Sequence, residues 1–377
     1  MGVGPLTAAG VEEARRLAAG ALAIERGGTP GDVRDSGVPT GELFAAVRRH
    51  RLASLLGPVA EQLGCPADEI AVLRDAQRRD ELAAMAVVSH VHRVHGVLER
   101  AGLRAIFFKG PALAAQTTGR ATARGAGDVD VWVSPGDLTA AHRALEADGL
   151  VPHPWYPTPG DSWGWRWMVR TYYELSLRSG ALHVDLHWHL DQNRTGLPDF
   201  DTAWGRRQGV DLLGREVPTL SALDALDHSC RHAEKDRYAW LRSLVDIQRL
   251  RTQVPSASAV ERRLTRRGLE VAATCLGSGA SGAEPAGTSR RSHAQEWPRK
   301  HPIGVGALAA LARHSRQAAT ARDLGRNLGL MVLPPRACGG VEADAWHRAV
   351  PMAARQRVAR AGRSPSAEDD VVEAAWT

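Results

Sequence analysis

Apolar residues recur at helical spacing through the first hundred positions of the chain. In residues 66–100 they fall three or four positions apart, which places them on one side of a helix. The stretches 7–26 and 41–56 have the same spacing, whereas residues 27–40 contain the Gly, Pro and Asp typical of a linker. The pattern predicts a helical N-terminal region that ends at Gly102.

From residue 103 onward the pattern changes to short apolar or alternating runs separated by turn residues. The last two runs flank Ser179-Gly180, the spacing of a two-residue hairpin. Short β-rich runs with helical stretches between them predict a small mixed sheet. The expected strands are 103–108, 128–133, 172–178 and 181–188, with helices at about 111–118 and 135–148.

Helical spacing returns after the predicted sheet. Ser221, with Asp224 three residues later, predicts a helix N-terminus, and the pattern continues through Leu250. Residues 151–168 are rich in Trp and Pro and are expected to form a loop. The Gly- and Ser-rich segment 276–296 is expected to be a flexible linker that is not packed.

These patterns divide the chain into six parts. They are an N-terminal helix and linker (1–40), a helical region (41–102), a sheet-containing core (103–215), a helical domain (216–275), a flexible linker (276–296), and a helical or partly disordered end (297–377).

Composition and charge exclude several classes of protein. With 44% apolar and 24% charged residues, the chain has the composition of a folded globular protein. The net charge of +6 comes from scattered residues, nearly all arginine, so nucleic acid is an unlikely partner. The four cysteines have no C-x-x-C spacing, and no run of about 18 apolar residues exists. We expect a cytoplasmic protein with no membrane partner.

Two carboxylates on one strand are the strongest chemical signal. Asp128 and Asp130 are separated by one residue, so on a strand both side chains point to the same face. At ~4 Å and an effective dielectric of ~20, their repulsion would cost ~4 kcal/mol, which a shared divalent cation converts into coordination. Mg²⁺ is the expected ion. In the alternative interpretation, Asp128 only ends the strand and Asp130 faces solvent.

Two further features fit this interpretation. Lys109-Gly110 follows the first strand, where a glycine lets the backbone approach phosphates. Asp185 lies on the last strand, on the face opposite Val184 and Leu186, and can complete a set of three metal-binding carboxylates. If the pair repels itself, Asp130→Asn spares the fold and leaves the ligand-free stability equal or higher.

The order of these motifs resembles an uncharacterised nucleotidyltransferase family of the DNA polymerase β-like superfamily. That family has a strand ending in L-K-G, an arginine before D-I-D, a D-L-H-W strand and a helical H-x-x-x-H segment. The corresponding residues here are Phe108-Lys109-Gly110, Arg124 with Asp128 and Asp130, Asp185 to Trp188, and His228 and His232 with Lys235, Trp240 and Asp246. Lys109-Gly110 stands where active superfamily members usually have Gly-Ser or Gly-Gly.

The resemblance implies a fold, an activity and a set of site residues. It implies a small mixed nucleotidyltransferase sheet with helical segments before and after it, and transfer of a nucleotidyl group from a nucleoside triphosphate (NTP) to a small-molecule or peptide acceptor. A catalytically weak nucleotide-binding or antitoxin-like protein is the alternative. The implied metal ligands and catalytic residues are Asp128, Asp130 and Asp185, and the implied nucleotide-binding residues are Lys109, Gly110, Arg124, His228, His232 and Lys235.

Histidines and tryptophans allow other interpretations. His183, His187 and His189 share strand parity with Asp185, which could present a site for a transition metal. His228 and His232 have zincin spacing, but Ser229 stands where that motif needs glutamate, so a protease is excluded. The pair can also be an ordinary helix-face contact. Four tryptophans before the hairpin can stack on a ligand or simply pack: Trp155, Trp163, Trp165 and Trp167.

Overall fold

The computed structural model describes most of the first 277 residues and one later helix. The described ranges are 5–30, 33–35, 37–153, 156–160, 162–255, 263–277 and 320–332. The predicted linker 276–296, apart from its first two residues, and most of the region 297–377 lie outside them. No helix in the described ranges is both long and apolar enough to cross a membrane.

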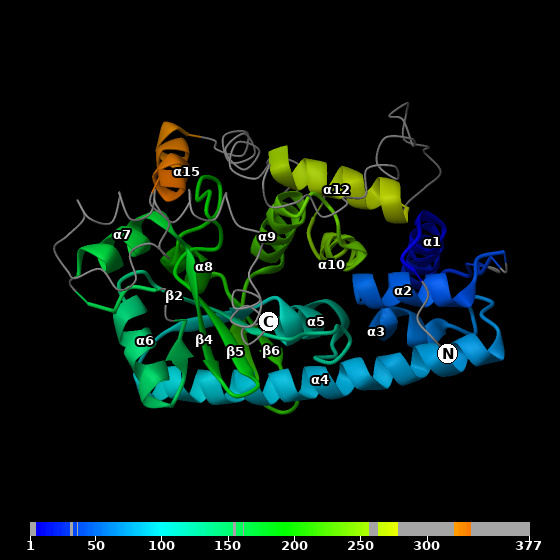
Figure 1. The fold of residues 1–377 in the computed structure, drawn as a ribbon, viewed down its shortest axis with the longest axis horizontal. Helices are drawn as coiled ribbons and strands as arrows, with labels where there is room; N and C mark the ends of the chain where they lie inside the picture. Colours follow the sequence, from blue (N-terminus) through cyan, green and yellow to red (C-terminus); the bar gives the residue numbers. More distant parts are fainter. Residues whose placement is uncertain are drawn as a thin grey trace, which may run out of the picture.

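Four α-helices and a short 3₁₀ helix form the N-terminal region. The longest, α4, continues past the others and runs beneath the sheet as well (Figure 1). Its apolar stripe, predicted from the spacing, is buried along both parts. The elements are α1 (Ala8–Glu25), α2 (Thr40–His50), α3 (Ala53–Leu56), η1 (Gly57–Val59) and α4 (Ala67–Arg100).

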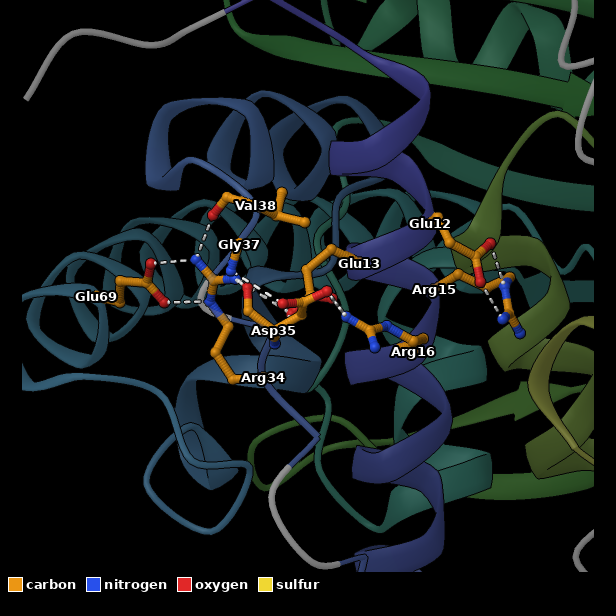
Figure 2. Close-up of polar contacts among 9 residues, drawn as sticks. All are labelled: Glu12, Glu13, Arg15, Arg16, Arg34, Asp35, Gly37, Val38 and Glu69. Carbon is orange, nitrogen blue, oxygen red and sulfur yellow. Dashed lines mark hydrogen bonds and ion pairs between the residues drawn. The ribbon is translucent and has the colours of Figure 1, made fainter.

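A buried ion-pair network joins α1 to α4 through the segment between α1 and α2 (Figure 2). Arg34 donates to both carboxylate oxygens of Glu69, at 2.8 and 2.6 Å, and its Nη1 lies 3.3 Å from Glu13. The side chains of Glu13 and Glu69 are 0% and 1% exposed. The segment that composition predicted as a linker is therefore anchored to the helices on both sides.

The central sheet has five strands in the order β1-β2-β5-β4-β3. Strands β2 and β5 are parallel, and the other neighbours are antiparallel. The sheet is mixed, as predicted. The strands are β1 (Ala105–Phe108), β2 (Val129–Val133), β3 (Val151–Pro152), β4 (Glu174–Ser179) and β5 (Leu182–His187).

Alternation along the strands divides the side chains between two cores. Val129, Val131 and Val133 of β2 pack on the face covered by α4 and α6 (Leu138–Ala147). On the other face, Trp132 belongs to a second core, which also contains residues of the N-terminal and C-terminal helices. Asp130 lies on that second face too, because it is two residues from Trp132.

Helices α9 (Ala222–Lys235), α10 (Leu241–Arg251) and α12 (Arg263–Leu276) form the helical domain after the sheet. They pack against one another, and α12 and α10 also contact α1 (Figure 1). The remaining elements of the described residues are α5 (Gly110–Thr118), α7 (Trp163–Thr171), α8 (Phe200–Gly205), the two-stranded sheet of β6 (Gln208–Asp211) and β7 (Glu216–Thr219), and α15 (Ala321–Val332).

The structure corrects two sequence-based expectations. The expected loop 151–168 contains β3 and the start of α7, whose N-cap Ser162 accepts a hydrogen bond from the Trp165 backbone N–H. The helix expected to run from residue 221 to 250 is interrupted between α9 and α10. Arg237 and Tyr238 there have φ angles of 57° and 56°, which reverse the chain direction without a glycine.

Candidate functional site

A cavity of about 300 Å³ lies where β2, β5 and the start of α5 face α9 and α10. Its walls combine acidic and basic side chains with few apolar ones. All nine residues predicted from the sequence line it: Lys109, Gly110, Arg124, Asp128, Asp130, Asp185, His228, His232 and Lys235.

Strand register brings the carboxylates together. The parallel pairing of β2 with β5 sets Asp130 directly beside Asp185, and both side chains line the cavity. Val184 and Leu186, which alternate with Asp185, are fully buried on the opposite face. Asp128 lies just before β2 and lines the same cavity, so the three acids share one face, as strand alternation predicted.

Asp130 is buried in contact with two basic side chains. Lys109 Nζ lies 2.6 Å from its Oδ1, and His187 Nε2 lies 3.3 Å from the same atom. Burial acts to raise the pKa of Asp130, but Lys109 and His187 outweigh it and hold this pKa far below its usual range. Its side chain is 3% exposed. The interpretation in which Asp130 faces solvent is therefore wrong.

The backbone at Lys109 is unusual for a residue with a side chain. Lys109 has φ 58° and ψ −160°, a combination found almost entirely in glycine, and it precedes Gly110 at φ 39°. This turn connects β1 to α5 and directs the lysine toward Asp130. Burial lowers the pKa of the Lys109 ammonium, but the Asp130 carboxylate more than reverses this and raises it.

The other two acids have different surroundings. Asp185 accepts a hydrogen bond of 2.6 Å from Ser176 Oγ and lies 3.3 Å from His183 Nε2. Burial opposes ionisation of Asp185, but the His183 contact lowers its pKa below the usual value. Asp128 has no such cation in contact among the described residues. Burial, followed by the charges of Asp130 and Asp185, raises the pKa of Asp128.

The donor set fits a hard divalent cation in kind. Carboxylate oxygens are the ligands Mg²⁺ prefers. The contacts described above use Oδ1 of Asp130 and Asp185, and Asp128 has the raised pKa of a carboxyl that lacks a cation. As the side chains stand, however, no three His, Cys, Asp or Glu residues in the described ranges lie close enough to hold a metal. Lys109 supplies the positive charge at Asp130.

This ion pair changes the expectation for Asp130→Asn. The sequence-based argument treated Asp130 as one of two repelling carboxylates and predicted equal or higher ligand-free stability. In the structure, the Asp130 carboxylate is attracted to Lys109 and His187. Asp128 is the carboxyl whose pKa is raised by burial and by its acidic neighbours. The expectation was therefore wrong about which acid is destabilising.

Helix α9 supplies two neutral histidines to the cavity wall. Burial, followed by the nearby Lys109 charge, lowers the pKa of both His228 and His232 well below the usual value. Their rings stack at 5.9 Å, and Phe108 meets His228 edge-on at 5.1 Å. Both rings line the cavity, so the pair is more than a contact within the helix face.

Basic side chains at the edges of the cavity are already engaged. Lys235 Nζ lies 2.8 Å from the Tyr173 hydroxyl. Arg124 Nε donates to both oxygens of Asp246, at 3.1 and 2.9 Å, which attaches the loop before β2 to α10. Arg120 is exposed and pairs with Glu81 outside the cavity.

The other sequence candidates fall outside the cavity or in the packing around it. His189 does not line the cavity, and burial lowers its pKa to about 3. Trp165 is buried in the core, and Trp163 stacks on Trp167 at 6.0 Å. Trp155 lies outside the described residues. The tryptophans described before the hairpin therefore pack, whereas Trp240 of the α9–α10 connection lines the cavity.

Several cavity residues were not identified as site residues from the sequence. Most come from the edges of elements, where no motif marks them. Arg242 had a signal, because it lies one helical turn before Asp246 and shares its side of α10. The charged residues and the tyrosine that were missed are Arg51, Tyr173, Glu174, Asp191, Asp236 and Arg242.

Comparisons with curated proteins and with solved structures find little similarity. A comparison with curated proteins finds no match. Among solved structures, the solution structure of the antibiotic-resistance factor ANT(2'')-Ia is 16% identical, with a TM-score of 0.37, over 50% of this chain and 94% of that chain. The crystal structure of ANT(2")-Ia in complex with adenylyl-2"-tobramycin is 15% identical, with a TM-score of 0.36, over 49% and 98%.

The family model described as uncharacterised nucleotidyltransferase matches residues 36–277. The match covers the N-terminal helices from the end of the α1–α2 segment, the sheet and the helical domain through α12. It includes every residue that lines the cavity, and it confirms the family resemblance carried by the four motifs. The chain belongs to the uncharacterised nucleotidyltransferase family.

Proposed function

We propose that this protein transfers a nucleotidyl group from an NTP to a hydroxyl or phosphate of a small-molecule or peptide acceptor. The observation that carries the proposal is the β2–β5 register, which aligns Asp130 with Asp185 and, with Asp128, brings three acids to one cavity beside the Lys109-Gly110 turn. Family membership supports the same reaction class.

In the proposed reaction, an acceptor oxygen forms a bond to the α-phosphorus while the bond to the β-phosphate oxygen breaks and pyrophosphate leaves. Asp128, Asp130 and Asp185 would hold Mg²⁺, which supplies charge stabilisation for the phosphates. Asp185, oriented by Ser176 and His183, is the proposed acceptor of the hydroxyl proton or a ligand of a second metal.

The remaining proposed nucleotide contacts come from the cavity walls. Lys109 and Gly110 are proposed to contact the phosphates at the N-terminus of α5. Arg124, His228, His232 and Lys235 are proposed to line the nucleotide-binding side. The low pKa values of both histidines support neutral hydrogen-bonding roles for them.

A nucleotide-binding protein without turnover, such as an antitoxin-like partner, is the second candidate. The Lys109–Asp130 ion pair favours it, because the ammonium contacts one of the oxygens that a metal would need. The two candidates share the cavity and differ only in whether the phosphate bond is broken.

Labelled nucleotides test the proposal. Each NTP, labelled at the α- or γ-phosphate, is incubated with the protein, Mg²⁺ and a cell extract, with Asp130→Asn as the control. Transfer of the α-label to an acceptor, with the γ-label released in pyrophosphate, is the expected result. Saturable binding without transfer would favour the second candidate, and transfer of the γ-label would contradict both.

A further inference from the structure

Three arginines line the end of the cavity nearest the N-terminal helices. Arg51 follows α2, Arg124 lies in the loop before β2, and Arg242 is in the first turn of α10. Burial, followed by the like charges of Arg124 and Arg51, lowers the pKa of Arg242 to about 9. The three guanidinium groups are therefore close enough to influence one another.

The contact between α2 and α10 holds two of these arginines in place. The Leu241 backbone N–H lies 3.4 Å from His50 Nδ1, and the Arg49 guanidinium lies 3.9 Å from the centre of the Trp240 ring. Arg51 comes directly after His50, and Arg242 directly after Leu241. The junction that joins the N-terminal region to the helical domain thus also positions Arg51 beside Arg242.

The carboxylates near the cluster leave part of its charge unpaired. Asp246 is engaged through both oxygens by Arg124. Arg242 Nη1 donates to the Gly125 carbonyl at 3.1 Å, while its Nε is enclosed and has no hydrogen-bond partner. No carboxylate in the described part of the chain lies within ion-pair distance of Arg242. An enclosed cationic donor without an anion is costly unless a ligand supplies one.

Asp80, Asp128 and Asp236 are the other carboxylates whose charges act on this end of the cavity. Asp80 accepts a 3.3 Å hydrogen bond from Ser54, Asp128 belongs to the acid group, and Asp236 lies 3.5 Å from His232 Nε2. None of the three lies within ion-pair distance of Arg51 or Arg242.

We propose that Arg51, Arg124 and Arg242 form a binding subsite for the phosphate groups of a substrate. Guanidinium groups match phosphate in charge and in hydrogen-bonding geometry. The inference rests on the proposed nucleotidyl transfer for the source of the phosphates. They are the β- and γ-phosphates of the donor or a phosphate on the acceptor.

Inorganic pyrophosphate is the probe, used in EDTA so that no metal takes part. Calorimetric binding and melting temperature are compared for wild type, Arg242→Gln and Arg51→Asn. Arg51 has φ 52°, a conformation that asparagine tolerates, and it is exposed, so Arg51→Asn keeps the fold. We expect each variant to weaken pyrophosphate binding by about tenfold or more, the loss of one charged contact.

Arg194→Gln is the matched control. Burial lowers the pKa of Arg194 to about 10, and its Nη2 donates to the carbonyls of Arg170 and Tyr172, but it does not line the cavity. This variant is expected to bind pyrophosphate as wild type does. Absence of pyrophosphate binding by wild type, or wild-type binding by both Arg51→Asn and Arg242→Gln, would overturn the subsite.

Competition identifies the source of the phosphates. If saturating NTP prevents further stabilisation by pyrophosphate, the subsite receives the donor's phosphates. If the two effects add, it receives a phosphate on the acceptor. These binding experiments do not measure nucleotidyl transfer, so a negative result would overturn the subsite without contradicting the proposed activity. The activity itself is tested only by the labelled-nucleotide experiment.

Discussion

Two aspartates separated by a single residue experience opposite electrostatic environments. Asp130 contacts Lys109 at 2.6 Å, and its pKa is held low. Asp128 is affected by burial and by the charges of its acidic neighbours, and its pKa is raised. The charge of Asp130 therefore stabilises the ligand-free fold, whereas the charge of Asp128 destabilises it.

The two asparagine substitutions should accordingly have opposite effects on the free energy of unfolding without ligand. At pH 7, Asp130→Asn should cost about 3 kcal/mol, because it leaves the partly buried Lys109 ammonium without its ion-pair partner. Asp128→Asn should gain about 1 kcal/mol, the size of other relieved charge repulsions. Urea unfolding of both variants and wild type measures the difference. The same sign for both would contradict the assigned environments.

The pH dependence of the Asp128→Asn effect follows from the raised pKa. Wild-type Asp128 is charged, and destabilising, above its folded-state pKa. As pH falls through that value the carboxyl gains a proton, so the gain from Asp128→Asn should be present at neutral pH and disappear in acid. Unfolding free energies of wild type and Asp128→Asn across this pH range measure the effect. If the stability gain from Asp128→Asn grew as the pH fell, the pKa of Asp128 would not be raised.

Lys109 combines an ion pair with a backbone conformation that favours glycine. Lys109→Met should cost about 3 kcal/mol by leaving Asp130 buried without its counter-ion. Lys109→Gly removes the same ion pair but relieves the backbone at φ 58°, so it should be more stable than the methionine variant by about 1 kcal/mol. Equal unfolding free energies for the two variants would exclude backbone strain at this position.

At the scale of elements, strand alternation was predictable and the connections were not. The sequence from Asp128 to Val133 alternates, which predicted the shared face of Asp128 and Asp130 and allowed Asp185 to be identified on β5. Helix α7 was missed because Trp, Pro and Gly dominate its surroundings, although Ser162 is a residue type that favours a helix N-cap. The local composition favoured a loop, whereas the helix buries Trp165 and Met168 in the core.

The break between α9 and α10 had no signal of the usual kind. Neither Gly nor Pro occurs there, yet Arg237 and Tyr238 both have positive φ. The Lys109–Asp130 pair was also missed, since a lysine before a glycine turn suggested contact with phosphates and the conformation that turns it toward Asp130 depends on the whole β1–α5 turn. Pairings between distant residues are not encoded in a local pattern.

Glycine at the α9–α10 connection should stabilise the protein. Arg237 is exposed and has φ 57°, so Arg237→Gly relieves a left-handed conformation without removing a described contact. We expect a gain of about 0.5 kcal/mol, because the added freedom of the unfolded chain offsets part of the relief. Arg237→Ala keeps the Cβ atom and should give no gain. Thermal unfolding distinguishes the two variants, and a loss for Arg237→Gly would contradict the argument.

At the scale of the whole molecule, the N-terminal helices are coupled to the rest by buried charges. Arg34 pairs with Glu69 and Glu13, and all three side chains are at most 4% exposed (Figure 2). Helix α4 then carries the connection beneath the sheet (Figure 1). The residue that follows α2, Arg51, lines the cavity. Its position therefore depends on the Arg34 network, which lies far from Asp128, Asp130 and Asp185.

Removing the Arg34 charge should destabilise the whole protein. Arg34→Met leaves Glu69 buried without a cation, while Glu13 keeps its ion pair with Arg16, and the substitution should cost about 3 kcal/mol. Arg93→Met is the control, since its pair with Asp148 at 2.7 Å is partly exposed and should contribute no more than about 0.5 kcal/mol. Chemical unfolding of both variants measures this, and equal effects would show that the buried network adds nothing beyond a surface pair.

Ligand-dependent melting tests the central claim, that the acid group of this cavity binds a metal–nucleotide. Wild type, Asp130→Asn and Asp224→Asn are melted with and without Mg²⁺ and NTP. Asp224 is a matched control, because it is fully buried, pairs with Arg206 at 2.5 Å and lies outside the cavity. Ligand at about a hundred times its Kd should stabilise wild type and Asp224→Asn by about 2.7 kcal/mol. Asp130→Asn should lose the part of this shift that depends on Mg²⁺, and a full Mg²⁺-dependent shift in that variant would contradict the claim.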